Sequence, residues 1–322
     1  MSLVAPHRAP FFHPKRVGPD HVTILMATCN GGTTIDAQLD SLAMQSHKDW
    51  SLIVSDDGST DDTLARVAAF AARHPTRRII RLRGPGRGSA LNFLSLLRAA
   101  GATPYAAFCD QDDVWMPERL AQGLAALRTV DAPAIHGGRT IIADAGLSPL
   151  RLSPLFKKPA SFENALVQNV AGGNTMLLNR AALDVLQPAS RHVDRLVAHD
   201  WWAYQMVTAL GGQMIWDPRP SVLYRQHGRN QIGANDTLRA SLSRARSLLS
   251  GRFAGWCTVQ TDALAPHRNR MTPGARAQFD LLMSLKSGGL WARLRAIPRV
   301  RLYRQTRRGT IALWAAICVG RL

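Results

Sequence analysis

The chain has 322 residues, a length that suits one catalytic domain with an appendage better than two large domains. Its composition, 46% hydrophobic and 19% charged, allows a full buried core and excludes general disorder. Lys and Arg number 40 against 22 Asp and Glu, and the resulting net charge of +18 predicts anionic partners.

The first segments of the chain alternate between strand and helix. Residues 1–20 contain several prolines, lack the apolar stretch of a signal peptide and are expected to form a flexible arm. Apolar, β-branched runs predict strands, and apolar residues at helical spacing predict helices. The predicted strands are 21–28, 50–55, 78–82 and 105–109, and the predicted helices are 34–45, 63–73 and 89–100. This order indicates an α/β domain with a mostly parallel sheet and a site at the carboxyl ends of its strands.

The pattern is looser after residue 115. We expect helices at 118–129 and 199–210, and strands at 134–142, 172–178 and 213–216. The catalytic domain is placed at 21–233. Residues 234–322 are expected to form a basic, mostly helical extension.

The extension carries most of the charge. Residues 235–322 hold 16 basic and three acidic residues and carry +13, which leaves +5 for the first 234 residues. Arginines between 293 and 308 alternate with apolar residues, which are Leu290, Trp291, Leu294, Ile297, Leu302 and Tyr303. This pattern favours contact with an anionic membrane surface, in two helical pieces separated at Pro298. A solvated helix packed on the catalytic domain or on a second subunit is the alternative.

The cysteines and the apolar runs indicate where in the cell the protein is located. The four cysteines are far apart and form no C-x-x-C, which favours reduced thiols in a cytoplasmic protein. The longest apolar run, 311–320, is about half of the roughly 20 residues that cross a bilayer. We therefore expect a cytoplasmic protein that does not span the membrane but can lie on its inner face.

Three carboxylates, Asp110, Asp112 and Asp113, directly follow the predicted strand 105–109. Like charges this close call for a compensating cation, and hard oxygen ligands favour Mg²⁺ or Mn²⁺. An acidic turn that caps the next helix is the structural alternative. An EF-hand does not fit, because the expected glycine of its loop is absent.

Two further loops follow strands. Asp56-Asp57-Gly58-Ser59 can receive the base and ribose of a nucleotide, or can be a turn that caps a helix. The segment from Gly84 to Ser89 nearly matches G-x-G-x-x-G, but Ser89 replaces the last glycine. It predicts a tight loop near a phosphate and only weakly a dinucleotide site.

The segment His199-Asp200-Trp201-Trp202 opens the predicted helix 199–210. Asp200 is either a helix cap or a general base, and the paired tryptophans suit a sugar face or the core. His227 follows a predicted strand and is a candidate metal ligand, although a lone histidine is more often not one.

Together these motifs resemble those of family 2 glycosyltransferases with the GT-A fold, over about residues 21 to 233. The resemblance rests on Thr28-x-Asn30, Asp56-Asp57-Gly58-Ser59-x-Asp61, Asp110-x-Asp112-Asp113 and His199-Asp200-Trp201-Trp202. Within that family, Cys109 to Trp115 and Tyr224 to Gly233 resemble bacterial rhamnosyltransferases of cell-surface polysaccharide synthesis.

The resemblance implies a metal-dependent, inverting transfer from a nucleotide-diphosphate sugar to a glycan acceptor, for which a lipid-linked glycan is expected. It implies Asp200 as the catalytic base and Asp110 and Asp112 as the metal site, with His227 added as a candidate ligand. The residues assigned to the donor are Thr28, Asn30, Asp57, Gly88, Ser89, Asn92 and Asp110. The residues assigned to the acceptor are Trp201, Trp202, Gly173 and Asn174.

Other functions remain open at this point. The donor can be another nucleotide sugar, such as a glucosyl or galactosyl donor. The net positive charge of the chain is compatible with nucleic-acid binding. However, no helix-turn-helix, zinc-finger or RNP-like motif occurs, so no nucleic-acid partner is expected. A non-catalytic membrane scaffold would not need the carboxylates. A homo-oligomer is compatible with the sequence.

Overall fold

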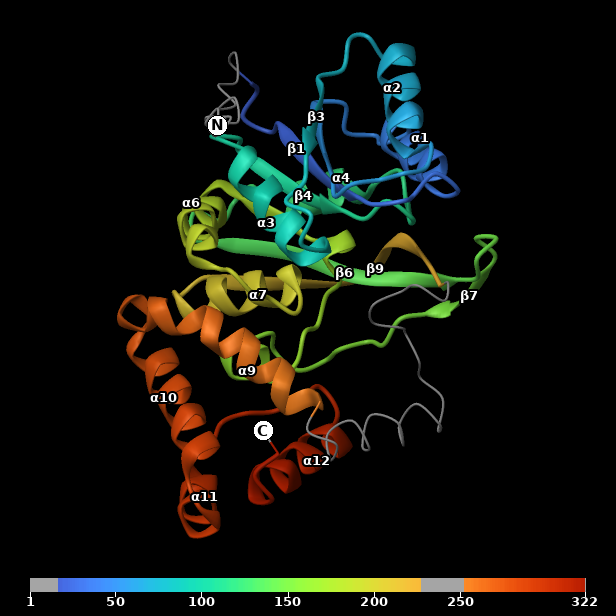
Figure 1. The fold of residues 1–322 in the computed structure, drawn as a ribbon. Helices are drawn as coiled ribbons and strands as arrows, with labels where there is room; N and C mark the ends of the chain where they lie inside the picture. Colours follow the sequence, from blue (N-terminus) through green and yellow to red (C-terminus); the bar gives the residue numbers. More distant parts are fainter. Residues whose placement is uncertain (1–16, 227–251, 322) are drawn as a thin grey trace, which may run out of the picture.

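The computed structural model describes residues 17–226 and 252–321. Its described strands form a nine-stranded sheet in the order β3-β2-β1-β4-β8-β6-β9-β5, with β7 paired to β6 (Figure 1). The strands are β1 (Val22–Thr28), β2 (Trp50–Asp56), β3 (Ile79–Arg83), β4 (Tyr105–Cys109), β5 (Val114–Trp115), β6 (Ala134–Ala143), β7 (Pro149–Leu152), β8 (Leu177–Asn179) and β9 (Gln213–Arg225).

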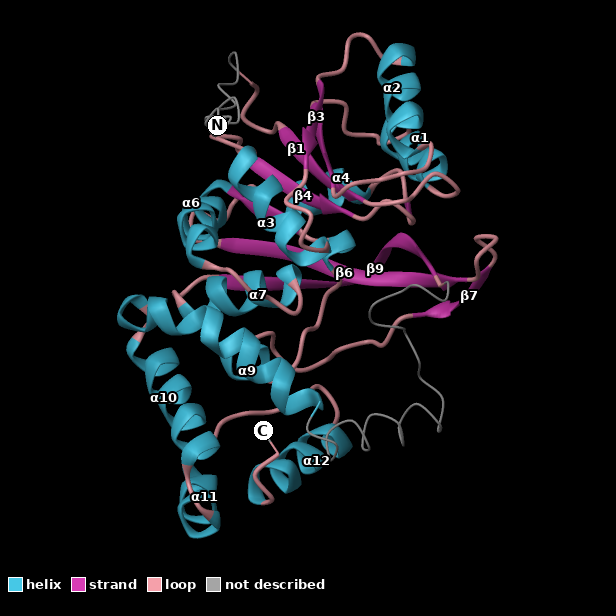
Figure 2. Cartoon of the chain, in the orientation of Figure 1, coloured by secondary structure: helices cyan, strands magenta, loops and turns pink. Residues whose placement is uncertain are grey.

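Helices flank this sheet and continue into the C-terminal region (Figure 2). Those of the first 226 residues are α1 (Ile35–Ala43), α2 (Thr63–Arg73), α3 (Ser89–Ala99), α4 (Arg119–Leu127), α5 (Phe162–Ala165), α6 (Arg180–Ala189) and α7 (His199–Ala209). Those of the C-terminal region are α9 (Arg252–Leu264), α10 (Pro273–Ser287), α11 (Leu290–Ala296) and α12 (Arg307–Cys318).

The predicted α/β order is confirmed in the first half of the sheet. Strands β3, β2, β1 and β4 are all parallel, and α1, α2 and α3 connect them. Both β1 and β2 are buried along their whole length, as expected for central strands covered on both faces. The carboxyl ends of β1, β2 and β4 therefore meet at one edge of the sheet.

The second half of the sheet departs from the prediction. The expected strand 172–178 is a 3₁₀ turn, Gly173–Thr175, followed by the short β8, which runs antiparallel to β4 and β6. The turn closes because both the amide and the hydroxyl of Thr175 donate to the carbonyl of Gly172, at 3.0 and 2.8 Å. Strand β9 is longer than expected and pairs parallel with β6, with register shifts opposite the segment that contains Pro218 and Pro220.

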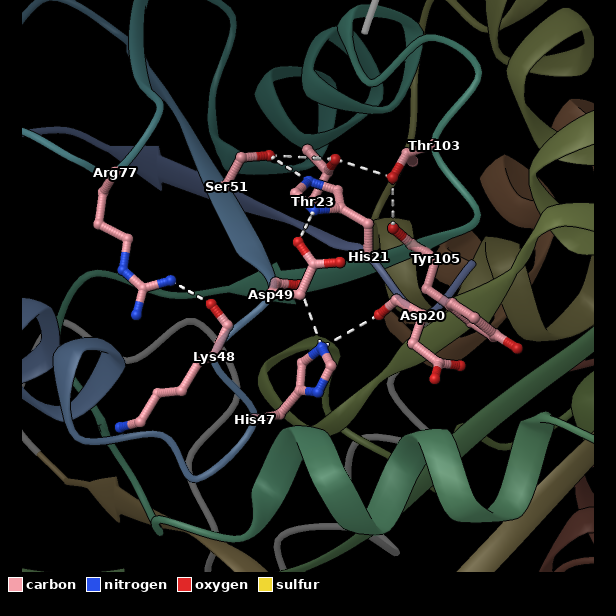
Figure 3. A network of polar contacts seen from close by, with 10 residues as sticks. All are labelled: Asp20, His21, Thr23, His47, Lys48, Asp49, Ser51, Arg77, Thr103 and Tyr105. Atoms are coloured by element: carbon pink, nitrogen blue, oxygen red, sulfur yellow. Dashed lines mark hydrogen bonds and ion pairs between the residues drawn. The ribbon is translucent and has the colours of Figure 1, made fainter. Parts of the chain in front are cut away.

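The opposite edge of the parallel strands is fixed by a polar network (Figure 3). The two ring nitrogens of His21 lie 2.6 Å from the carboxylate of Asp49 and 2.9 Å from the hydroxyl of Ser51. The hydroxyl of Thr23 donates to that of Thr103 at 2.9 Å. These contacts hold the amino ends of β1, β2 and β4 together and leave the carboxyl edge for a site.

The C-terminal helices pack on the catalytic half of the molecule. Helix α9 lies against α7, and α10 lies against α5 and α7 (Figure 1). Residues of this region share one hydrophobic core with α7; they include Cys257, Leu264, Phe279, Leu282, Leu313 and Ile317. The expectation of helices is confirmed for the described residues from 252 on, whereas the boundary placed at 233 lies outside the described part. None of the described helices is both long and apolar enough to cross a bilayer.

Candidate active site

Three loops meet at the carboxyl edge of the parallel strands, and Asp56 joins two of them. The hydroxyl of Thr28, at the end of β1, donates to Asp56 at 2.9 Å. On the other side the amide and the hydroxyl of Ser59 donate to the same carboxylate, at 2.8 and 2.5 Å. Asp56 is buried, and its carboxylate accepts hydrogen bonds from the protein itself. It therefore stabilises the loop that we predicted to bind the nucleotide.

Asp57 points across to the glycine loop that precedes α3. Its two carboxylate oxygens accept the amides of Gly86 and Gly88 at 2.6 and 2.8 Å. Both glycines have positive φ angles, of 67° and 88°, which a residue with a side chain rarely adopts. The loop is therefore a fixed turn held by Asp57, and Ser89 begins the helix behind it. A carboxylate has about four acceptor positions, so Asp57 keeps capacity for a ligand donor.

The loop after β1 is joined to the loop after β4 by Gln111. Its side-chain amide accepts the backbone N–H of Cys29 at 2.9 Å and donates to the carbonyl of the same residue at 3.0 Å. Asn30, with a φ of 50°, accepts the amide of Thr60 at 2.8 Å. The sequence analysis did not single out Gln111, although it lies between two of the assigned carboxylates.

Asp110 and Asp112 are half-buried at the end of β4. Desolvation raises the pKa of Asp110 well above its usual value, and the charges of Asp113, Asp112 and Asp200 raise it further. The ring of His199, next to Asp200, lies 4.7 Å from that of Phe108, two residues before Asp110, so the assigned base and the D-x-D motif lie in the same region. The cluster has the chemistry of a cation site, since a bound cation would offset the repulsion.

Asp113 turns inward, away from this edge. It is fully buried, and it accepts the side-chain amide of Asn174 and, at 3.1 Å, the backbone N–H of Arg225. Burial and the charge of Asp112 raise its pKa to about 7. The sequence grouped Asp113 with Asp110 and Asp112 as three neighbouring carboxylates and left it out of the metal site, and its buried contacts give it a structural role.

Arg119 supplies a buried cation behind the carboxylates. Its guanidinium donates to the carbonyls of Asn174, Phe108 and Met176 at 2.9 to 3.2 Å and stacks 3.4 Å from the ring centroid of Trp115. Burial lowers its pKa to about 9. The sequence analysis missed this residue, because nothing in its local pattern separates it from a surface arginine of α4.

Asp200 lies in the first turn of α7 and is held by several donors. Its oxygens accept the amides of Gly173 and Trp201 at 2.9 and 2.6 Å, and the side chain of Asn169 also donates to it. Desolvation nevertheless raises its pKa. The N-cap of α7 is Ala198, and Asp200 lies in the first turn, where its carboxylate also binds the free N–H of Trp201.

His199 is a buried, neutral neighbour of Asp200. Its ring stacks on Phe93 at a centroid distance of 3.8 Å, and burial lowers its pKa to about 3. A Cβ added to Gly173 would lie 2.5 Å from its Nε2, so only glycine fits there. The imidazole of His199 and the turn at Gly173 therefore pack closely against each other beside Asp200.

Several residues assigned from the sequence are interior and their assignments are corrected. The hydroxyl of Thr28 is committed to Asp56, and the amide of Asn92 donates to the carbonyl of Ser55 at 2.8 Å, so these side chains support the donor loops from behind. The amide of Asn174 is buried against Asp113.

The two tryptophans are also interior. Trp202 is fully buried, and the indole N–H of Trp201 donates to the carbonyl of Ala165 at 2.6 Å. Both belong to the hydrophobic core and present no face to a sugar. His227 lies outside the described residues.

Only a few side chains of the protein would be ligands of a bound metal ion. Within residues 17–226 and 252–321, no three His, Cys, Asp or Glu side chains converge as a ready metal site. Asp110 and Asp112 fit a Mg²⁺ or Mn²⁺ ion that takes its other ligands from phosphate oxygens and water, the usual arrangement for Mg²⁺ at nucleotides. All four cysteines are unpaired, and Cys29 is exposed beside this edge.

A cleft of about 310 Å³ borders the glycine loop on the outer side of α3. Its lining includes Arg87, Arg98 and Arg191 but none of the carboxylates described above. The cleft is therefore separate from the carboxylates at the strand ends.

The family follows from a comparison with known proteins. Residues 23–186, slightly more than half of the chain, match the model of glycosyl transferase family 2. The chain belongs to this family. It is a glycosyltransferase, with a mixed α/β fold of the GT-A type, and both the fold and the family resemblance expected from the sequence are confirmed.

Among the relatives of this family 2 chain is the dTDP-rhamnosyl transferase RfbG of Shigella flexneri. It is 27% identical over 255 residues, which are 74% of this chain and 84% of RfbG. The UDP-Glc:alpha-D-GlcNAc-diphosphoundecaprenol beta-1,3-glucosyltransferase WfgD of Escherichia coli is 25% identical over 166 residues, 51% of this chain and 62% of WfgD. S. aureus TarS 1-349, in complex with UDP-GlcNAc, is similar in structure, with a TM-score of 0.54, 13% identity and coverage of 94% of this chain and 89% of TarS.

Proposed function

We propose that this glycosyltransferase moves L-rhamnose from dTDP-rhamnose to a lipid-linked glycan, with inversion at the anomeric carbon. The observation that carries the transfer is that the start of α7, with Asp200, lies against the end of β4, with Asp110: the rings of His199 and Phe108 are 4.7 Å apart, and the charge of Asp200 raises the pKa of Asp110. The similarity to RfbG supports the donor, and that to WfgD supports a diphosphate-lipid acceptor.

The donor would bind along the carboxyl edge of β1, β2 and β4. In this proposal Asp57 and the loop of Asn30 would bind the base and ribose, and the N–H groups at the start of α3, from Ser89 on, would face the diphosphate. Asp110 and Asp112 would hold a divalent cation, which supplies charge to stabilise the leaving diphosphate.

Asp200 would remove the proton of the acceptor hydroxyl. The acceptor oxygen then bonds to the anomeric carbon, and the bond from that carbon to the diphosphate oxygen breaks, with both electrons leaving on the nucleoside diphosphate. The donors from Gly173, Trp201 and Asn169 keep Asp200 oriented, while its raised pKa makes it a stronger base than a solvated aspartate.

Thermal unfolding with dTDP, UDP and GDP, each with Mn²⁺ or with EDTA, tests the donor site. Binding to the folded chain raises the melting temperature, and we expect the largest rise for dTDP with Mn²⁺. NMR of the product formed from dTDP-rhamnose then reports the anomeric configuration. If UDP gave the largest rise, and if the enzyme turned over a UDP-hexose but not dTDP-rhamnose, the donor would be a glucosyl or galactosyl donor and the proposal of rhamnose would be wrong.

A further inference from the structure

Two helices of the C-terminal region, α11 and α12, carry apolar side chains on faces that nothing in the described chain covers. In α11 no residue is buried, and Leu290, Trp291 and Leu294 are 51, 74 and 39% exposed. Helical spacing puts these three on one side of α11.

Helix α12 has two apolar faces. Leu313, Ala316 and Ile317 are buried and face the core. Ile311 and Trp314, which are 65 and 42% exposed, lie on the other side, since they are three residues apart in the helix. A surface helix normally has a polar outer face, so this arrangement indicates a second apolar environment.

The two apolar faces lie in one region of the surface. Helix α11 packs against α12, and the guanidinium of Arg293 lies beside Gly320, just past the end of α12. Both helices are at the end of the molecule that is remote from α1 and α2 (Figure 1). We call the exposed residues Leu290, Trp291, Leu294, Ile311 and Trp314 the tail surface.

The segment that carries the tail surface has charges of one sign. Residues 281–322 contain nine Lys and Arg and no Asp or Glu. Some of the basic residues are used internally: Arg304 donates to the carbonyl of Val167, and Arg293 to that of Leu285. Others are exposed, and they are Arg295, Arg299, Arg301, Arg307, Arg308 and Arg321.

We propose that the tail surface docks on an anionic lipid bilayer, with its tryptophans and aliphatic side chains in the acyl boundary and the exposed arginines among the headgroups. Exposed Trp, Leu and Ile beside arginine are the composition of interfacial membrane helices. A symmetric dimer through the same surface would bring like charges together, and the segment 281–322 has no acidic residue to offset them. Aliphatic side chains would have no partner on a nucleic-acid backbone.

This surface differs from the one expected from the sequence. Leu302 is 2% exposed, and the hydroxyl of Tyr303 donates to the carbonyl of Pro159 at 2.6 Å, so neither reaches outward. Instead, Ile311 and Trp314 of α12 are exposed and belong to the tail surface. Removing everything after residue 289 would open the core, and point variants of the full chain are therefore the appropriate test.

The test is sedimentation of the full chain with vesicles of phosphatidylcholine alone or mixed with phosphatidylglycerol, without donor or acceptor. We expect sedimentation with the anionic vesicles only, reduced by salt. Arg307→Glu with Arg308→Glu should weaken partitioning by at least roughly tenfold, because each basic residue near a membrane contributes about a fivefold factor. Trp291→Ser with Ile311→Ser should weaken it similarly.

Matched controls separate this surface from net charge and from general hydrophobicity. Arg195→Glu with Arg270→Glu makes the same charge change at exposed sites elsewhere, and Met44→Ser with Leu64→Ser removes exposed apolar groups near α1 and α2. Both should bind vesicles like the wild type. Equal losses in the controls, or no loss in the tail variants, would overturn the proposal. So would a wild-type dimer that Trp291→Ser makes monomeric without any change in vesicle binding.

Membrane docking goes beyond the proposed transfer and can fail separately. Turnover with a water-soluble acceptor should be the same in the tail variants and in the wild type. A chain that binds vesicles but transfers no sugar would refute the proposed function alone.

Discussion

Asp110, Asp112 and Asp113 are almost adjacent in sequence, but the fold gives them different surroundings. Asp113 is fully buried against Asn174 and the backbone of Arg225, whereas Asp110 and Asp112 are half-buried at the sheet edge beside Asp200. One carboxylate therefore belongs to the interior, and the other two lie at the edge where the donor is proposed to bind.

Asp112→Ala should abolish both transfer and the Mn²⁺-dependent part of nucleoside diphosphate binding while the protein still folds. The reason is the loss of one of two carboxylates proposed to hold the cation. Calorimetric titration with dTDP, in the presence of Mn²⁺ or of EDTA, measures the Mn²⁺-dependent part of binding. Asp184→Asn, at an exposed carboxylate paired with Arg180, serves as the control. Full turnover of the wild type in excess EDTA would contradict the metal role.

Asp200→Asn should keep nucleotide affinity and lower kcat by at least roughly a hundredfold, the usual cost of removing a general base. Asparagine can still accept from Gly173, so large unfolding is not expected. Turnover in the wild type should also fall on acidification at a higher pH than for an ordinary aspartate, because the pKa of Asp200 is raised. Near-normal turnover of the variant would leave Asp200 a structural residue.

The pKa of Asp113 predicts a pH dependence of stability. Its value of about 7 exceeds 3.8, so the folded chain binds the proton more tightly than the unfolded chain. The stabilisation is complete below about pH 4 and is lost as the pH rises to about 7. Asp113→Asn should flatten the free energy of unfolding across this range, measured by urea denaturation in EDTA. Parallel curves for variant and wild type would argue against the raised pKa.

At the scale of elements, the site depends on contacts between turns. Gln111 holds the turn after β1 to the turn after β4 through two hydrogen bonds to Cys29. Gln111→Ala should raise the KM for the donor by roughly tenfold and change kcat little, because two hydrogen bonds that order a binding loop contribute about 1 to 3 kcal/mol. Gln187→Ala, whose amide bonds the carbonyls of Leu97 and Gly101 away from the site, is the comparison.

The 3₁₀ turn before β8 gives a second prediction at this scale. Gly173→Ala would put a methyl group 2.5 Å from Nε2 of His199 and 3.4 Å from Cβ of Asp200, and should lower kcat by at least roughly tenfold. Gly255→Ala in α9 meets nothing within 4 Å and should leave kcat unchanged. Steady-state kinetics of the two variants decides it; similar values for both would show that the turn tolerates a side chain.

The elements also show how far the sequence predicts this molecule. The order β1-α1-β2-α2-β3-α3-β4 follows from local apolar patterns, and so does the edge where Asp57 and Asp110 lie. The roles of Arg119 and Asn174 do not, because their bond joins residues 55 positions apart. Likewise, a tryptophan at a helix start has the same local pattern whether it faces a sugar or the core, and only packing decides that Trp202 is buried.

At the scale of the whole molecule, the C-terminal region completes the core of the catalytic half. Leu313→Ala, at a fully buried position of α12, should lower the free energy of unfolding by about 2 to 5 kcal/mol. Ile311→Ala, on the outer face of the same helix, should change it by about 0.5 kcal/mol or less. Urea denaturation of both variants measures this, and equal effects would contradict the assigned faces of α12.

The shared core has a consequence for how the enzyme is made. Helix α7 carries the proposed base, yet it is covered by α9 and α10, and the core it belongs to includes Leu302, Leu313 and Ile317. During synthesis, the parallel strands β1 to β4 leave the ribosome before these residues. Until they arrive, the apolar face of α7 stays open to solvent or to chaperones. We therefore expect the region around Asp200 to reach its final form only after the C-terminal helices have folded onto α7.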